Sequence, residues 1–225
     1  PDRYQRDALG YITVVDARPV SFARISSDEL RWGLRFRQHI GGGDGGESSG
    51  EDSENPGGRA ALRQGIGGWR IDGDLYHTWT LRSNRQARAG LPVVDLLGGG
   101  ATGYGGGLPR HGLEGRIGLA HGGLGLQIKG SWQSASLIRS GAAPVASDLR
   151  FAPFGKLDAR IFADFGRVLP ERNWAKGMRL SVEAVNLTDA HQVVRDRAGI
   201  VPLGYQRYLL DPLGRTISVS LRKAF

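Results

Sequence analysis

The chain ends in the stretch Gly214-Arg215-Thr216-Ile217-Ser218-Val219-Ser220-Leu221-Arg222-Lys223-Ala224-Phe225. From Ile217 to Leu221 every second residue is apolar, Phe225 falls on the same side, and polar residues lie between them. Because successive side chains of a strand point to opposite faces, this stretch predicts a β-strand with one apolar and one polar face. A soluble antiparallel strand alternates in the same way, so the fold must be decided by the rest of the chain.

The same alternation returns in six earlier segments. They are Glu29–Ile40, Trp69–Arg82, Leu113–Leu119, Leu124–Trp132, Leu157–Phe165 and Met178–Ala184. Most are near the roughly 9–11 residues that cross a bilayer as a tilted strand. With the less regular stretch Ile12–Ile25 and the final strand, the pattern predicts about eight strands. No helical periodicity persists, so we predict an all-β chain.

Composition excludes several classes of protein. The 225 residues contain no cysteine, which excludes a disulfide framework, a thiolate nucleophile and a zinc–cysteine site. No apolar run reaches the roughly 18 residues of a transmembrane helix. The net charge of +8 suggests nucleic acid as a binding partner. However, the basic residues are spread over all segments and lie mostly opposite the tryptophans, so we expect no nucleic-acid binding.

Tryptophans and connections favour a membrane. Trp32, Trp69, Trp79 and Trp132 lie on apolar faces, mostly near segment ends, which is typical of a membrane interface. Ala120–Gly123 predicts a tight hairpin turn. Three stretches predict long loops: Gly41–Gly68, which is acidic and glycine-rich, Arg82–Pro109 and Ser140–Gly155. Short turns on one side and long extracellular loops on the other are typical of outer-membrane barrels, so we expect Gly41–Gly68 on the extracellular side.

No motif predicts catalysis. The run Gly98–Gly103 matches G-x-G-x-x-G, but the glycines and proline after it cannot begin the helix that a dinucleotide site needs, so we predict a surface loop. The five histidines show no metal-ligand spacing. A nucleophile elbow and a zinc-protease motif are both missing from the sequence. We expect no enzyme activity, no cofactor and no metal.

A resemblance begins at Met178. The stretch Met178–Asp189, which ends in Asn186-Leu187-Thr188-Asp189, resembles the penultimate strand of TonB-dependent receptors. In that family a loop rich in Gly and Tyr follows, here Gly199–Tyr208, and then Gly-Arg opens the closing strand to a final Phe. The positions that match are Asn186, Leu187, Asp189, Gly214, Arg215 and Phe225. The likeness is sharp over the last third of the chain, and upstream only the barrel pattern continues.

The resemblance implies an antiparallel transmembrane β-barrel of about 22 strands, filled by an N-terminal plug domain. It also implies uptake of a scarce solute of the siderophore-iron, cobalamin or glycan type, driven by TonB through the plug. This sequence has about eight strands and no plug-like segment, and it opens on Pro1. We therefore expect residues 1–225 to be the C-terminal portion of such a barrel, with a leader or more of the protein before Pro1.

The same resemblance implies a place and partners for the chain. The place is the outer membrane of a Gram-negative bacterium, and the partners are its lipid and lipopolysaccharide, the barrel-assembly machinery, and TonB through the plug. Ile217, Val219, Leu221 and Phe225 would form the assembly signal of the last strand, so deleting Phe225 is expected to lower outer-membrane levels. The polar residues expected to face the barrel lumen are Arg31, Arg35, Asp72, Tyr76, Arg160 and Glu183.

Two alternatives remain open. The first is a self-closed eight-stranded outer-membrane barrel with an adhesin or structural role. Closure would pair Ile12–Ile25 with Arg215–Phe225, and Asp16, Arg18 and Pro19 make the first of these a poor lipid-facing strand. The second alternative is a soluble β-sandwich that binds acidic ligands.

Overall fold

The computed structural model describes residues 4–15, 22–41, 68–101, 107–139 and 148–224. Strands make up 56% of the described residues and helices 8%. The strands arise where apolar and polar residues alternate, because that pattern suits the two faces of a pleated strand. The prediction of an all-β chain is confirmed.

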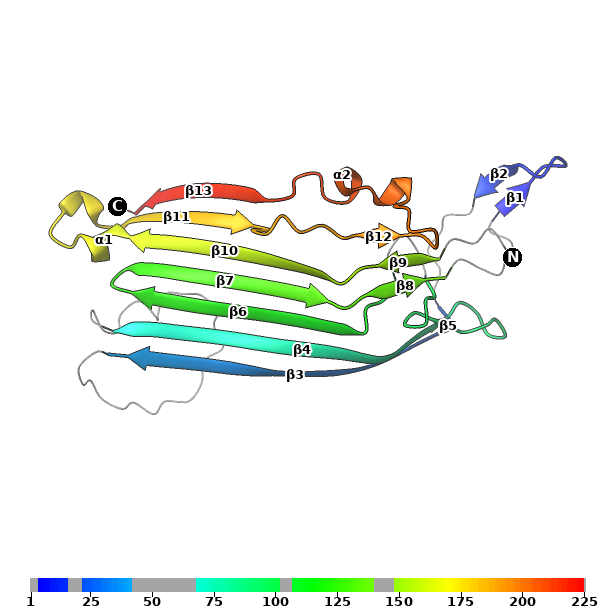
Figure 1. Ribbon diagram of the computed structural model, residues 1–225, viewed down its shortest axis with the longest axis horizontal. Coiled ribbons are helices and arrows are strands. Elements are labelled where there is room, and N and C mark those ends of the chain that lie inside the picture. The colour runs from blue at the N-terminus through cyan, green and yellow to red at the C-terminus, as the bar shows by residue number, and fades with distance from the viewer. Residues whose placement is uncertain (1–3, 16–21, 42–67, 102–106, 140–147, 225) are drawn as a thin grey trace.

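The main sheet is eight-stranded, and its paired strands are antiparallel (Figure 1). Seven strands follow the order β13-β11-β10-β7-β6-β4-β3, and β5 (Val94–Asp95) pairs with β4. The seven are β3 (Arg24–Ile40), β4 (Trp69–Gln86), β6 (His111–His121), β7 (Leu124–Gln133), β10 (Phe154–Asp164), β11 (Met178–Val185) and β13 (Thr216–Lys223). They correspond to the six alternating segments and the final stretch of the sequence.

Short elements lie outside this sheet. β1 (Tyr4–Arg6) pairs with β2 (Ile12–Val15), and β8 (Ser136–Ile138), β9 (Leu149–Phe151) and β12 (Val194–Arg195) form a three-stranded sheet. The helices are α1 (Phe165–Val168), η2 (Asn173–Ala175), η3 (Leu203–Tyr205) and α2 (Arg207–Leu210). These pieces are too short for periodicity to reveal, and the sequence did not predict them.

The predicted strand Ile12–Ile25 is wrong. Ile12–Val15 at its start forms a strand that pairs with β1, Phe22 and Ala23 lie outside any strand, and β3 begins at Arg24. Residues 16–21 lie outside the described residues. Among the described residues, neither Ile12–Val15 nor Arg24–Ile25 pairs with β13, so the pairing that self-closure would need is not seen there.

The sheet is open. Among the described residues, β3 has only β4 as a long-strand neighbour, and β13 has only β11. The backbone groups on the outer side of each edge therefore have no partner strand within the described residues. The described strands alone do not close into a barrel.

The two ends of the sheet differ. One, the turn end, holds the hairpin turn Gly122-Gly123, α1 and the end of β13; the other, the loop end, holds β5, β8, β9, β12 and α2 (Figure 1). Gly122 and Gly123 have φ of 54° and 92° between the paired residues His121 and Leu124, so the predicted tight hairpin turn is confirmed.

The long stretch Gly41–Gly68 does not leave from the same end as the other two predicted loops. Ile40 pairs with Trp69, and Arg70 pairs with Ala120, so the residues that flank this stretch lie at the turn end. Antiparallel strands alternate in direction, which sends every second connection to the same end. The grouping of this stretch with Arg82–Pro109 and Ser140–Gly155 on one side is therefore wrong, and residues 42–67 themselves lie outside the described residues.

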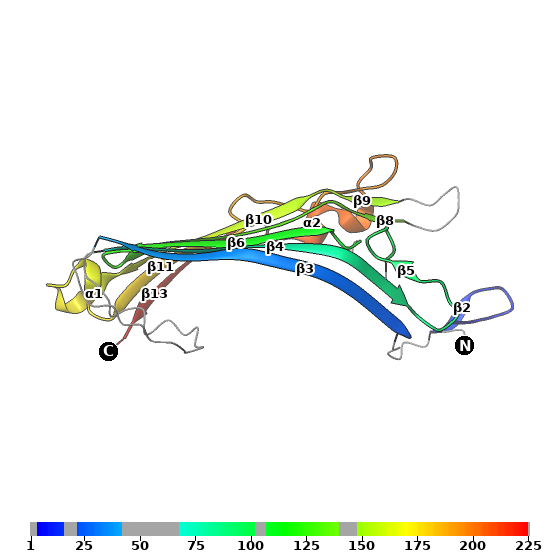
Figure 2. The same cartoon turned by 90° about the horizontal axis from the view of Figure 1, so that it is seen from below.

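The long strands form one layer, which Figure 2 shows nearly edge-on as a single curved sheet. The buried hydrophobic residues of the described chain are Leu96, Phe151, Ala175 and Val194, and none belongs to a long strand of the main sheet. None of the helices in the described part of the chain is long and apolar enough to cross a membrane. Within the described part of the chain, no hydrophobic core is packed on either face of the main sheet.

Candidate functional site

The residues Asn186 to Asp189 form the turn by which β11 leads back toward β13. Asn186 is 1% exposed and has a φ of 54°, in the left-handed region that asparagine tolerates better than most residues. Its Nδ2 donates to the Ala190 carbonyl oxygen at 3.0 Å, and its Oδ1 accepts from the Ala190 N–H at 2.9 Å. Its own N–H donates to Asp158 Oδ1 on β10 at 2.8 Å. Asn186 therefore fixes both the shape of the turn and its position against β10.

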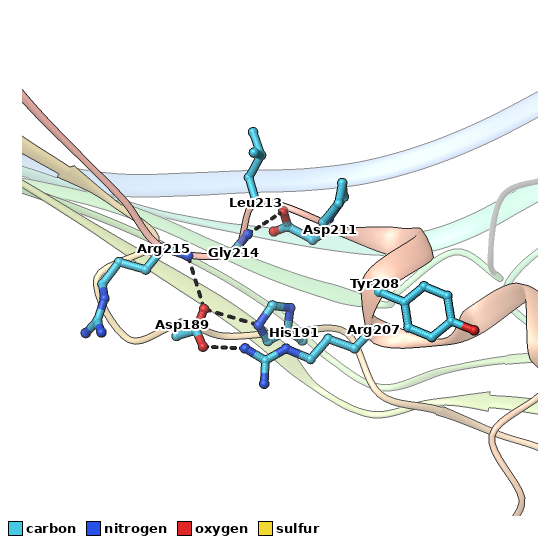
Figure 3. A pocket seen from close by; sticks show the side chains of 9 residues that line it. Asp189, His191, Arg207, Tyr208, Asp211, Leu213, Gly214 and Arg215 are labelled. Carbon is cyan, nitrogen blue, oxygen red and sulfur yellow. Dashed lines mark hydrogen bonds and ion pairs between the residues drawn. The ribbon is translucent and has the colours of Figure 1, made fainter.

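The Asp189 carboxylate joins this turn to the start of β13 (Figure 3). Its Oδ1 accepts from the Arg215 N–H at 3.0 Å and lies 3.2 Å from His191 Nε2, and its Oδ2 accepts from the Arg207 guanidinium. The Arg215 N–H, the Arg207 guanidinium and His191 hold the pKa of Asp189 below its usual value, and desolvation opposes them. The carboxylate is therefore ionised near neutral pH and serves as a hydrogen-bond acceptor.

Gly214 is the residue that lets these two segments approach. Its φ is 56°, and a Cβ at this position would lie 2.5 Å from Asp189 Oδ1. Its N–H donates to Asp211 Oδ1 at 3.1 Å, and Asp211 Oδ2 lies 3.2 Å from Lys156 Nζ on β10. Lys156 and the Gly214 N–H lower the pKa of Asp211. Only glycine satisfies both the backbone angle and the close contact.

Together these residues form what we call the Asp189 clasp: Asn186, Leu187, Asp189, His191, Arg207, Asp211, Gly214 and Arg215. The motif residues predicted from the sequence, Asn186, Leu187, Asp189, Gly214 and Arg215, are all brought together here, and the Arg215 guanidinium also donates to the Leu187 carbonyl oxygen at 3.5 Å. The clasp borders a hollow of about 450 Å³. Most polar groups of the clasp form hydrogen bonds or ion pairs with one another. The arrangement is therefore suited to positioning β13 against β11 rather than to transforming a substrate.

Sequence reasoning missed the partners that complete the clasp. Asp158 and Lys156 come from β10, while His191, Arg207 and Asp211 come from the long connection between β11 and β13. Asp158, Lys156 and Arg207 contact partners 28, 55 and 18 residues away along the chain, so no local pattern marks them. His191 and Asp211 have partners two and three residues away, but no motif singles them out. Only the pairing of β10 with β11 places Asp158 under Asn186.

The residues expected to face a lumen share one face of the sheet, which we call the polar face. Arg31 lies 2.9 Å from Glu114 and its guanidinium lies 5.0 Å from the Tyr76 ring centroid. Arg35 donates to the Tyr76 hydroxyl at 3.1 Å. Exposed pairs of this kind contribute only about 0–1 kcal/mol each to the free energy of folding. They therefore make this face hydrated and charged but add little stability.

The other three predicted residues lie nearer the turn end of the same face. Asp72 is the cross-strand neighbour of Arg37, and Arg160 is the cross-strand neighbour of Glu183. The structure thus brings Arg31, Arg35 and Tyr76 together and places Asp72 and Arg160 in a separate group. Opposite charges on neighbouring strands favour this register.

The opposite face, which we call the apolar face, carries the hydrophobic half of each strand. Leu34 is 67% exposed, Ile117 52%, Ile161 58% and Val219 67%. Further exposed members are Leu30, Phe36, Leu75, Leu113, Leu124, Val182, Ile217 and Leu221. Of the predicted assembly residues, Ile217, Val219 and Leu221 thus lie on this face, and Phe225 lies outside the described residues.

Aromatic side chains border the apolar face near both ends. Toward the loop end, Trp32 and Trp79 lie beside His77 and His111, with ring centroids 5.3 Å apart for Trp32–His77 and 5.9 Å for Trp79–His111. At the turn end, Trp69 stacks on His121 at 4.5 Å. Each of these rings has an apolar body and a polar nitrogen, a chemistry suited to the boundary between apolar and aqueous surroundings.

Neither a protein-family model, nor a curated protein, nor a solved structure matches this chain. Within the described residues, no three His, Asp or Glu side chains gather in a way that would hold a metal ion.

Proposed function

We propose that this chain forms part of the wall of an outer-membrane β-barrel of the TonB-dependent receptor type, which takes up a scarce solute. The observation that carries the proposal is the single-layer sheet whose apolar face is exposed while its opposite face is charged. A soluble sheet buries its hydrophobic face against a second layer. In a bilayer, lipid chains cover that face and no second layer is needed.

The size of the apolar face supports this placement. Trp69 and Trp79 lie ten residues apart on β4, which corresponds to ~33 Å along a strand. A strand tilted by about 40° would then rise ~25 Å, which matches the ~25 Å apolar band between the aromatic girdles of outer-membrane barrels.

The open edges support a wall that continues beyond these strands. In hydrocarbon every backbone N–H and C=O must be paired, so β3 and β13 would each require a further strand. A larger barrel of about 22 strands supplies them, whereas the described strands alone do not close. The remaining partners in the proposal are lipid and lipopolysaccharide on the apolar face, the assembly machinery at β13, and TonB acting through a plug domain.

The Asp189 clasp has a role within this proposal. It fixes the start of the edge strand β13, whose apolar residues Ile217, Val219 and Leu221 would be presented to the assembly machinery. The transported solute is of the siderophore-iron, cobalamin or glycan type, as the family resemblance implies.

The test uses the absence of cysteine, since each single substitution introduces the only thiol. Two neighbouring pairs sample both faces: Ile128→Cys with Lys129→Cys on β7, and Val182→Cys with Glu183→Cys on β11. The chain is refolded into lipid vesicles and labelled with an environment-sensitive fluorophore. We expect quenching by spin-labelled acyl chains at Ile128 and Val182, and quenching by aqueous iodide at Lys129 and Glu183.

Equal iodide quenching on both faces would overturn the proposal, because it would place the apolar face in water. Protection of the apolar face from both quenchers would also overturn it, since that is the result expected of a soluble sandwich.

A further inference from the structure

A second hollow lies on the polar face, close to the turn end. Its volume is about 170 Å³. We call it the arginine trough and define it by Arg70 and Asp72 on β4, Gly118 on β6, and Arg160, Phe162 and Arg179 on β10 and β11. It shares no residue with the Asp189 clasp.

The trough exists because its floor is built from small residues. In one cross-strand row Asp72 is followed by Gly118, Gln127 and Arg160, and in the next row Arg70 is followed by Ala120, Gly125 and Phe162. The long side chains of β4 and β10 therefore stand three strand spacings apart, ~14 Å between backbones. Gly118 and Ala120 place no long side chain between them, and the Asp72 carboxylate lies over Gly118.

One wall of the trough is held in place by an aromatic ring. The Phe162 ring lies directly over Gly125, where any Cβ would clash with it. The Arg179 guanidinium lies over the same ring, 4.3 Å from its centroid. Stacking fixes the plane of a guanidinium and leaves the N–H groups at its edge available.

Two of the arginines have unused donors. Arg160 makes no hydrogen bond or ion pair with the described residues, although Glu183 is its cross-strand neighbour. The Nε of Arg179 is buried and lacks a hydrogen-bond partner among them. The exposed Arg160 guanidinium can therefore donate to a ligand without giving up a bond to the described residues.

The charge of the trough has a definite sign. The residues that line it, Arg70, Arg160 and Arg179 with the single acid Asp72, are net positive. Glu183 and Asp164 are the cross-strand neighbours of Arg160 and Arg179, outside the lining. Asp72 also lies opposite Arg37 on β3, which offsets its charge. The lining therefore attracts anions and repels cations.

We propose that the arginine trough binds the oxyanion group, carboxylate or phosphate, of a small solute. The planar fork of a guanidinium matches both groups with two parallel hydrogen bonds. A hollow of about 170 Å³ is smaller than the ~300–1,000 Å³ clefts that hold drug-sized ligands, so it suits one small anion. The binding site rests on the geometry of the sheet alone, and its position on a lumen wall rests on the proposed function.

The experiment titrates the full chain, refolded in detergent micelles, with citrate and with inorganic phosphate in separate calorimetric runs. We expect saturable binding of at least one, and the two runs show which oxyanion is preferred. Arg160→Gln and Arg179→Gln each remove one fork and are expected to weaken binding about tenfold or more. Arg179→Lys keeps the charge without the fork and should fall between Arg179→Gln and the unmodified chain.

The matched control is Arg31→Gln. It makes the same chemical change on the same face, but the Arg31 guanidinium is already paired with Glu114 outside the trough. We expect its affinity to stay within about twofold of the unmodified chain. Arg160 is exposed, so Arg160→Gln is expected to keep the fold even if the Arg179 variants do not.

Two results would overturn the inference. One is the absence of saturable binding for both probes, and the other is an equal loss for Arg31→Gln and Arg160→Gln, which would indicate general attraction to a basic face. Neither result bears on the fluorophore experiment above, because lipid contact of the apolar face does not depend on the trough. Failure of the anion site and failure of the membrane proposal can therefore be told apart.

Discussion

Replacing Asn186 by alanine tests whether the Asn-Leu-Thr-Asp motif is a structural clasp. The change removes both side-chain hydrogen bonds to Ala190, each contributing about 1 kcal/mol. It also forces alanine into a φ of 54°, which costs about 1 kcal/mol more than glycine at the same angle. The expected loss in the free energy of unfolding is about 3 kcal/mol for Asn186→Ala.

A second variant separates the two causes. Asn186→Gly loses the same hydrogen bonds but adopts the left-handed backbone freely, so we expect a loss of about 2 kcal/mol. Thr188→Ala is the control, because Thr188 is exposed in the same turn and makes no hydrogen bond with the described residues. It should change stability by less than about 0.5 kcal/mol.

The assay is equilibrium urea unfolding of the refolded chain in detergent, followed by far-ultraviolet circular dichroism. The transition must be two-state for the free energies to be compared. A loss below about 0.5 kcal/mol for Asn186→Ala would refute the reasoning, because two buried hydrogen bonds cannot vanish at that cost. An Asn186→Gly variant that is less stable than Asn186→Ala would refute the part that concerns the backbone angle.

Three further predictions follow from the clasp and the apolar face. The lowered pKa values of Asp189 and Asp211 stabilise the fold above the unfolded pKa of about 3.9, and that stabilisation is lost as the pH falls through the folded values. Measured as unfolding midpoint against pH, the acid limb should therefore flatten in Asp189→Asn and Asp211→Asn, and an unchanged limb would contradict the assignment. Gly214→Ala should lower the free energy of unfolding by more than about 1 kcal/mol in the urea assay, because the left-handed backbone and the contact with Asp189 both oppose a Cβ. A stability equal to that of the unmodified chain would contradict this, because it would mean that the clasp tolerates a side chain there. Ile117 lies midway along the apolar face, and Ile117→Arg should lower the free energy of unfolding in vesicles by about 2–4 kcal/mol. Lys129→Ala on the polar face should lower it by less than about 0.5 kcal/mol. Similar losses at both sites would count against lipid contact.

The long strands were predictable because alternation with a period of two is a local property. The segments from Glu29 to Ile40 and from Trp69 to Arg82 both appear as strands, although β3 begins earlier and β4 ends later than predicted. The same reasoning overreached at Ile12–Ile25, where irregular alternation was given too much weight. It also misplaced Gly41–Gly68, because loop composition was used where strand direction decides the side.

The motif residues of the clasp could be named from the sequence, but their action could not be derived from it. Asp189 and Arg215 are 26 residues apart in the chain, and their hydrogen bond depends on the pairing of β11 with β13. The roles of Asp158 and Lys156 could not be predicted from the sequence, because charged residues are common on the polar face of any strand. The arginine trough was hidden for the same reason, because three strand spacings separate its two walls.

The sequence by itself determined that this protein is made of two-faced strands, and which residues belong to each face. That information is local, since neighbouring side chains point to opposite sides of any strand. Only the tertiary structure decided the order of the strands, the open edges at β3 and β13, and the end from which each connection leaves. It also decided which distant side chains meet in the Asp189 clasp and the arginine trough, because such meetings depend on the register between segments far apart in the chain.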